Sequence, residues 1–212
     1  MKGVPPLLQF CLVAFTSIFV LVDPIAAVPT FLVMSHADPV RRHQMAVKAS
    51  WTCFIVLSVF AIAGTFLFEM FGITLPAFRI AGGVVLGLIG LDMLRGQRSA
   101  TKETPGEAME GAEKEDAGII PLGIPMLAGP GSMSSVTVLM AQNHDWPHKG
   151  IVLGAIAASS VASFLILAAA DRVGDRLHET GIRILSRLMG LLLTAIAVQF
   201  ILNGLHDVGL AR

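Results

Sequence analysis

One acidic residue, Asp23, lies deep inside an apolar stretch of the sequence, directly before Pro24. An ionised carboxylate at the centre of a bilayer costs about 2.5–3.5 kcal/mol on insertion scales, so it needs a partner or a purpose there. Asp23 can cap the helix that Pro24 begins, because aspartate is a preferred N-cap residue. It can also bind the ammonium group of a substrate, a coupling cation or a transferable proton. The two roles are compatible.

A second interruption spans residues 121–132, which contain three prolines and three glycines within an apolar stretch. Proline lacks a backbone donor and is tolerated at the first position of a helix. We therefore expect Pro24 and Pro130 each to begin a half-helix, with Asp23 and Gly129 as the preceding caps. The alternative is that both segments are ordinary proline kinks, whose freed backbone groups are satisfied by neighbouring helices.

The start of a half-helix presents free N–H groups and the positive end of a dipole, which suits a carboxylate or another anion. Paired interruptions in two halves of a membrane protein point to a transporter's binding site near the midplane of the bilayer. We predict a substrate site between the two breaks, formed by Asp23, Pro24, Gly129, Pro130, Gly131 and Ser132.

Hydroxyl groups cluster beside both breaks, at Thr16, Ser17, Ser132, Ser134, Ser135 and Thr137. They can supply neutral ligands to the site, or they can bond backbone carbonyls and pack helices, as such residues do in membranes. Further along the chain, Gln199 and Asn203 are expected to form hydrogen bonds between helices.

Catalytic motifs are not found in the sequence. His178-Glu179 is not followed by a histidine at the zincin spacing, GxSxG does not occur, and no second acid accompanies Asp23. We expect no enzyme, no catalytic residue and no cofactor. Metal ligands are not assigned, and coupling to Na⁺ or H⁺ is left open.

The composition excludes a water-soluble fold. Of 212 residues, 54% are hydrophobic and only 14% are charged, and the mean hydropathy is +0.75, whereas charged residues make up about 25% of a soluble domain. The formal net charge is zero, so no basic field is available to bind nucleic acid. The lipid bilayer is the expected partner, and a homo-oligomer is left open.

Six apolar stretches follow one another along the chain, at residues 7–35, 46–71, 76–95, 119–141, 150–170 and 184–205. Each reaches the ~20 residues that a helix needs to cross a bilayer. The sequence thus predicts a single transmembrane domain over residues 1–212. Of the 15 Lys and Arg residues, 11 fall on one side if the helices alternate, which places residues 96–118 in the cytoplasm as a linker and both termini outside.

The linker divides the chain into two similar halves, 1–95 and 119–212. Arg79 and Arg187 both begin R-x-x-G, and Asp23-Pro24 lies over Gly129-Pro130 when the halves are superimposed. Each half contains three predicted helices, which is an odd number. The second copy of a duplicated unit therefore enters the bilayer in the opposite orientation to the first. We predict an all-α membrane protein of six transmembrane helices, arranged as two inverted three-helix repeats, with helices 1 and 4 broken at the midplane.

The two interruptions resemble conserved segments of the MarC family of membrane proteins. Residues 23–29 (DPIAAVP) are similar to that family's D-P-x-G-x-x-P, and residues 121–131 (PLGIPMLAGPG) to its P-L-x-x-P-L-L-A-G-P-G. Ala26 departs from the family's glycine and leaves less room for a ligand. The resemblance implies a multi-pass protein of the bacterial inner membrane and, for some members, transport of small neutral amino acids.

Three functions are compatible with these observations. A transporter of small zwitterions would match the substrate ammonium with Asp23 and its carboxylate with N–H groups near Gly131 and Ser132. An ion or proton channel would need a continuous polar stripe, which no predicted helix carries. A non-transporting assembly protein would need no acid at the midplane. We favour the transporter.

The charge asymmetry of the loops predicts that both termini face the periplasm. An alkaline-phosphatase fusion after Arg212 should therefore be active, and a cytoplasmic fluorescent reporter fused at the same position should be dark. A fusion placed within residues 97–118 should behave in the opposite way. An inactive phosphatase together with a bright fluorescent reporter after Arg212 would show that the orientation is reversed.

Overall fold

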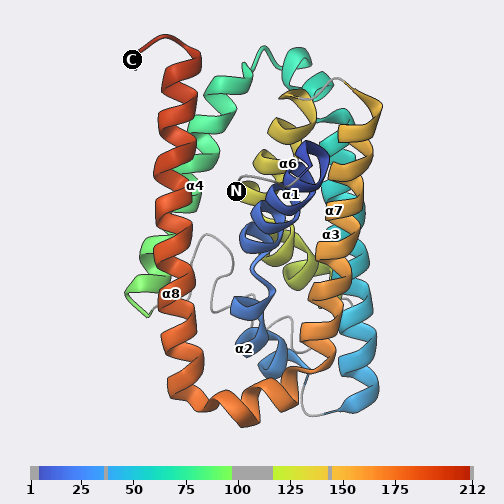
Figure 1. Cartoon of the computed structure of the whole chain (residues 1–212). Helices are drawn as coiled ribbons and strands as arrows, with labels where there is room; N and C mark the ends of the chain where they lie inside the picture. The colour runs from blue at the N-terminus through green and yellow to red at the C-terminus, as the bar shows by residue number, and fades with distance from the viewer. Residues whose placement is uncertain (1–4, 36–37, 97–116, 143–144, 211–212) are drawn as a thin grey trace.

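A computed structural model of the chain describes residues 5–35, 38–96, 117–142 and 145–210 (Figure 1). All regular structure in these residues is helical, so the expected all-α class is confirmed for them. The elements are α1 (Pro6–Val22), α2 (Pro24–Met34), α3 (Pro39–Met70), α4 (Leu75–Leu94), η1 (Gly118–Leu127), α6 (Pro130–Gln142), α7 (Trp146–Ala168) and α8 (Ala170–Asp207). Most of the predicted linker, residues 97–116, lies outside the described residues.

The described helices are long and apolar enough for five or six membrane crossings. Five candidate spans are Pro6–Met34, Pro39–Met70, Leu75–Leu94, Trp146–Ala168 and Ile184–Asp207, and η1 with α6 forms a sixth if this bent pair is one span. Large apolar side chains such as Ile62, Phe66 and Leu165 remain exposed on the outside of these helices. A surface of this kind suits lipid and confirms a multi-pass membrane protein.

Side-chain caps begin two of the spans, α3 and α4. The Asp38 carboxylate accepts a hydrogen bond from the backbone N–H of Val40 (3.0 Å) and begins α3. The Thr74 hydroxyl accepts one from the N–H of Ala77 (3.3 Å) and begins α4. Both helices carry proline in their first two positions, where its missing donor costs nothing. The sequence therefore encodes these starts locally.

Two helices, α4 and α8, pack antiparallel along one side of the molecule (Figure 1). A Cβ added to Gly90 would lie 2.9 Å from the carbonyl oxygen of Gly190, and one added to Gly190 would lie 2.9 Å from that of Gly90. Gly83 and Gly204 approach the facing backbone in the same way, at 2.8 and 3.0 Å. Small residues permit this close backbone contact, as in other membrane helix pairs.

The remaining elements surround α6, whose residues 131–138 are almost all buried. A helix buried on all sides belongs to the interior of a bundle, and α6 packs against α1, α3, α4 and α7. The main apolar core joins α1, α2, α3, η1, α6 and α7, and includes Ile18, Phe31, Leu57, Leu122, Val136 and Ile156. A smaller core, with Leu21, Leu86 and Leu193, lies between α1, α4 and α8.

The contact between Gly90 and Gly190 leads to a test of the α4–α8 packing. Gly190→Ala should lower the thermal stability of the purified protein in detergent by about 1–3 kcal/mol, because the new methyl group overpacks the interface. Gly154→Ala is the matched control, since a Cβ there meets nothing within 4 Å and alanine favours the helix. Equal melting temperatures for the two variants would contradict the observed packing.

Candidate functional site

The first break lies at Asp23, between α1 and α2. Its backbone adopts the left-handed region (φ 48°, ψ 59°), and the side chain is buried. The Asp23 N–H donates to the carbonyl of Phe19 at 3.0 Å and closes α1. One carboxylate oxygen accepts from the N–H of Ala26 at 3.4 Å and caps α2, which begins at Pro24. Asp23 therefore ends one helix and starts the next.

The second break lies between η1 and α6, which meet at a bend of 60°. The helix α6 begins at Pro130, and the carbonyl of Gly129 accepts the N–H of Met133 at 3.0 Å. The Ser132 hydroxyl lies 2.9 Å from the same carbonyl oxygen and 3.2 Å from that of Leu127. Side-chain and backbone donors from α6 thus satisfy the carbonyls at this break.

The glycines of the second break are positions of close packing. A Cβ on Gly131 would collide with the side chain of Leu86 on α4, and one on Gly129 would lie 2.9 Å from the carbonyl oxygen of Pro125. Neither glycine has a positive φ. Their lack of a side chain is required by the neighbouring atoms and not by an unusual backbone conformation.

The two breaks lie between elements that pack on one another, because α1 packs against α6 and α2 packs against η1. Val22 and Leu127, which flank the breaks, belong to one apolar core. Of the predicted site residues, Pro130 is half-buried and the other five are buried. Asp23 is therefore buried between α1 and α2, next to residues of the main apolar core.

Of the six candidate hydroxyl residues, Thr16 is exposed, and Ser132 bonds carbonyls at the second break. Ser17 and Ser135 line a cavity. The Thr137 hydroxyl instead lies within hydrogen-bond distance of the carbonyl oxygens of Met133 (2.9 Å) and Phe60 (3.0 Å) and links α6 to α3. Ser134 faces Gly82, since a Cβ on that glycine would lie 2.6 Å from its hydroxyl oxygen.

The cavity has a volume of about 190 Å³ and lies between α1, α4, α6 and α8. Its polar lining consists of Ser17, Arg79, Ser135, Gln142 and Asn203, and its apolar lining of Leu21, Val138, Leu139, Ile196 and Phe200. Leu21 is two residues from the first break and Ser135 is three residues from the predicted site residue Ser132. This volume is below the ~300–1,000 Å³ of pockets for drug-sized ligands, so it suits a small molecule.

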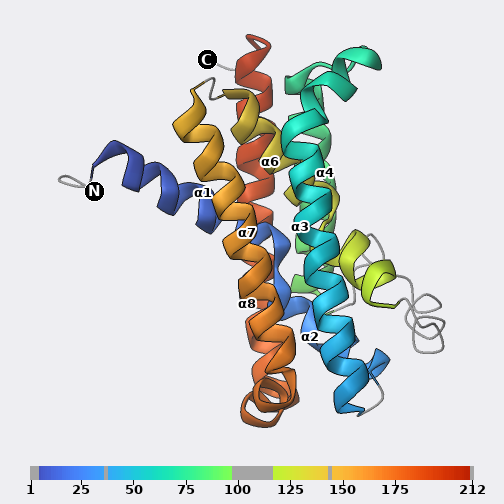
Figure 2. The ribbon, with the colours of Figure 1, turned by 90° about the vertical axis from the view of Figure 1, so that its right-hand side faces the viewer.

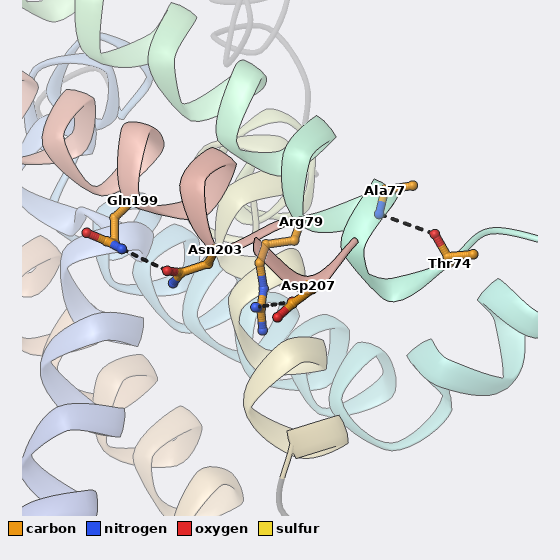
Figure 3. A network of polar contacts seen from close by, with 6 residues as sticks. All are labelled: Thr74, Ala77, Arg79, Gln199, Asn203 and Asp207. Atoms are coloured by element: carbon orange, nitrogen blue, oxygen red, sulfur yellow. Dashed lines mark hydrogen bonds and ion pairs between the residues drawn. The ribbon is translucent and has the colours of Figure 1, made fainter. Parts of the chain in front are cut away.

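An arginine that sequence reasoning missed lines this cavity. Arg79 on α4 has a side chain only 5% exposed, and its Nη1 atom lies 2.6 Å from Oδ2 of Asp207, whose side chain is 37% exposed (Figure 3). A buried cation inside an apolar run is a signal of function in membrane proteins, and Arg79 within residues 76–95 carries that signal. Its partner lies 128 positions away in the chain.

The expectation for Gln199 and Asn203 is wrong. The Gln199 amide donates to the carbonyl oxygen of Asn203 at 2.7 Å within α8 itself, and the pair is exposed (Figure 3). Two polar side chains one helical turn apart satisfy each other in this way without a second helix.

A second hollow lies on the outer surface between α3 and α7. It has a volume of about 360 Å³ and an almost wholly apolar lining that includes Trp51, Phe54 and Phe164. Lipid chains fit such a groove, and it lacks the charged group that the smaller cavity contains. No group of three or more His, Cys, Asp or Glu side chains that could hold a metal ion occurs among the described residues.

These features define a multi-pass helical membrane protein with a small cavity between α1, α4, α6 and α8. The chain belongs to the MarC family, because the sequence model described as MarC family integral membrane protein matches residues 8–208. The resemblance stated from residues 23–29 and 121–131 is confirmed.

Relatives cover nearly the whole chain. A UPF0056 membrane protein of Methanocaldococcus jannaschii is 42% identical over 94% of this chain and 97% of its own. Others so named are 35% identical in Aquifex aeolicus, over 92% of this chain and 91% of the relative, and 31% identical in Escherichia coli, over the same shares. Comparison with solved structures gives no match.

The contact between Gly131 and Leu86 can be measured by a double-mutant cycle. Gly131→Ala should destabilise the protein by about 1–3 kcal/mol, because the methyl group meets the leucine side chain. In a Leu86→Ala background the same change should cost little, since the space is then available. Thermal unfolding of the four proteins in detergent gives the coupling. Additive effects would show that the two residues do not touch.

Proposed function

We propose that the protein is an inner-membrane secondary transporter of small neutral amino acids or similar small zwitterions, with its site between the two helix breaks. The observation that carries the proposal is Asp23, a carboxylate buried to 1% exposure at the junction of α1 and α2. A buried acid in a membrane protein is retained for a purpose. Membership in a family of integral membrane proteins supports the membrane location in this proposal.

The proposal includes two inverted repeats, in which α1, α2, α3 and α4 correspond to η1, α6, α7 and α8. The helix contacts support this, because α3 packs on η1 and α6 while α7 packs on α1 and α2. Likewise α4 packs on α6, and α8 packs on α2. In Figure 2, α1 and η1 approach from opposite sides, and α2 and α6 run toward opposite ends. The breaks then fall near the membrane midplane, as in other transporters with inverted repeats.

The site would bind a zwitterion through complementary charges. Asp23 would hold the ammonium group while its other interactions keep α2 capped. The Ser17 and Ser135 hydroxyls beside the breaks would add neutral hydrogen bonds. Asp23 does not line the cavity, but Leu21, two residues away, does, and the small volume of the cavity would limit the substrate side chain to a few atoms. A transporter releases its substrate without chemical change, so the proposed function needs no catalytic residue.

Transport by purified protein in proteoliposomes tests the proposal. Neutral amino acids should be screened under Na⁺ and pH gradients, which also identify the coupling ion. Asp23→Asn should reduce uptake to about one hundredth of the wild-type rate or less, because a buried charge partner is lost. The variant should stay folded, since asparagine caps a helix about as well as aspartate.

Asp38→Asn is the matched control. Asp38 caps α3 in the same way, but it is exposed, so this variant should retain uptake. If Asp23→Asn keeps wild-type uptake of every amino acid that the parent carries, Asp23 is only a cap and the site is wrong. If the parent carries none, and the liposomes instead conduct ions or remain inert, the protein is a channel or an assembly protein.

A further inference from the structure

The buried Arg79 is held by a single contact. Within the described part of the chain, its guanidinium makes one hydrogen bond, from Nη1 to Oδ2 of Asp207. A guanidinium carries five N–H donors in a planar fork that matches a carboxylate through two parallel bonds. The contact with Asp207 uses one of these donors, and Arg79 also lines the cavity. The rest of the fork is therefore available to a molecule bound there.

Helix capping does not explain the positions of the two charges. Asp207 is the last residue of α8, where the negative end of the helix dipole disfavours a carboxylate. Arg79 lies one turn inside the start of α4, beyond the groups that need a cap. Stability is also a weak reason to bury such a pair, because apolar side chains of similar size stabilise as well or better.

The lining of the cavity selects a class of ligand. Arg79 is the only charged residue among its described lining residues, and the other polar groups are hydroxyls and amides. One cation matches one carboxylate, whereas a dicarboxylate would leave a second charge buried without a partner. Leu21 and Phe200 supply an apolar wall for a short carbon chain.

We propose that Arg79 is the carboxylate-binding residue of this cavity and that Asp207 is a built-in competitor, which occupies Arg79 when no ligand is bound. A small monocarboxylate displaces the Asp207 carboxylate, so one anion replaces another on the guanidinium and the charge of the cavity does not change. That the natural ligand is an amino acid rests on the proposed function. The exchange of the Asp207 carboxylate for a monocarboxylate on Arg79 does not depend on that function.

The difference in exposure supports the division of roles. Arg79 is fixed inside the bundle, whereas more than a third of the Asp207 side chain reaches the surface. The acid can therefore move into water when it is displaced, at little cost in desolvation. Removing it should strengthen the binding of a carboxylate ligand, because the ligand no longer competes with an internal anion.

Thiol labelling can test this exchange without transport. Ser135→Cys places a reporter in the cavity wall, and Cys11→Ala with Cys53→Ala removes the natural thiols. The rate of reaction with a methanethiosulfonate reagent is measured with propionate or with propionamide, which has the same shape but no charge. Propionate should slow labelling several-fold, and propionamide should not.

Variants of the pair make the test specific. Arg79→Gln should abolish protection by propionate, and Arg79→Lys, which keeps the charge but loses the fork, should weaken it. Asp207→Asn should lower the half-protective concentration of propionate by about tenfold, the value of one charge-assisted hydrogen bond. Asp38→Asn removes an acid elsewhere and should leave that concentration unchanged. Gel filtration verifies that each variant is folded. If Arg79→Gln does not fold, Arg79→Lys and Asp207→Asn test the proposal.

Equal protection by the two probes, or an unchanged half-protective concentration in folded Asp207→Asn, would overturn the proposal. Its failure can be distinguished from that of the transport function. A parent protein that takes up no amino acid but shows Arg79-dependent protection by propionate retains this inference and loses the proposed function. A parent protein that takes up an amino acid, but whose labelling propionate does not slow, gives the reverse result.

Discussion

In a lipid environment, every backbone polar group must find a partner within the protein. The two helix breaks are where that constraint is hardest to meet, and the interior of the bundle is arranged around them. Asp23 satisfies the start of α2, and Gly129 and Ser132 bond the start of α6 to the end of η1. Thr137 lies against a carbonyl oxygen of α3. These partners are short side chains and backbone atoms, so they reach only groups that lie close by. This requires α6 to be packed closely by α1, α3, α4 and α7, which also exclude lipid from it.

The sequence predicts the membrane spans and the two new helix starts, because proline, caps and apolar length are local signals. It does not predict contacts between distant residues. Nothing near Gly131 indicates that Leu86 covers it, and nothing near Arg79 indicates Asp207. The Ser132 hydroxyl is a similar case, since it suits a ligand or a carbonyl equally well until the shape of the break is known.

The proposed repeat relates Arg79 to Arg187, but their surroundings differ. Arg79 is buried and ion-paired, whereas Arg187 is exposed. The glycine three residues after each arginine also differs in its neighbour, since Gly82 faces Ser134 while Gly190 faces the backbone of α4. In the proposed repeat, the two R-x-x-G segments therefore occupy equivalent positions with different surroundings.

The glycine contacts between α4 and α8 have a mechanical consequence. Their backbones touch at several levels, from Gly204 against Pro76 at one end to Gly190 against Gly90 further along. Sliding one helix past the other would drive side chains into backbone atoms. We therefore expect α4 and α8 to move as one rigid unit. A conformational change in this bundle would therefore bend or rotate elements other than α4 and α8, and residues 23 and 128–129 are places where one helical segment ends and another begins.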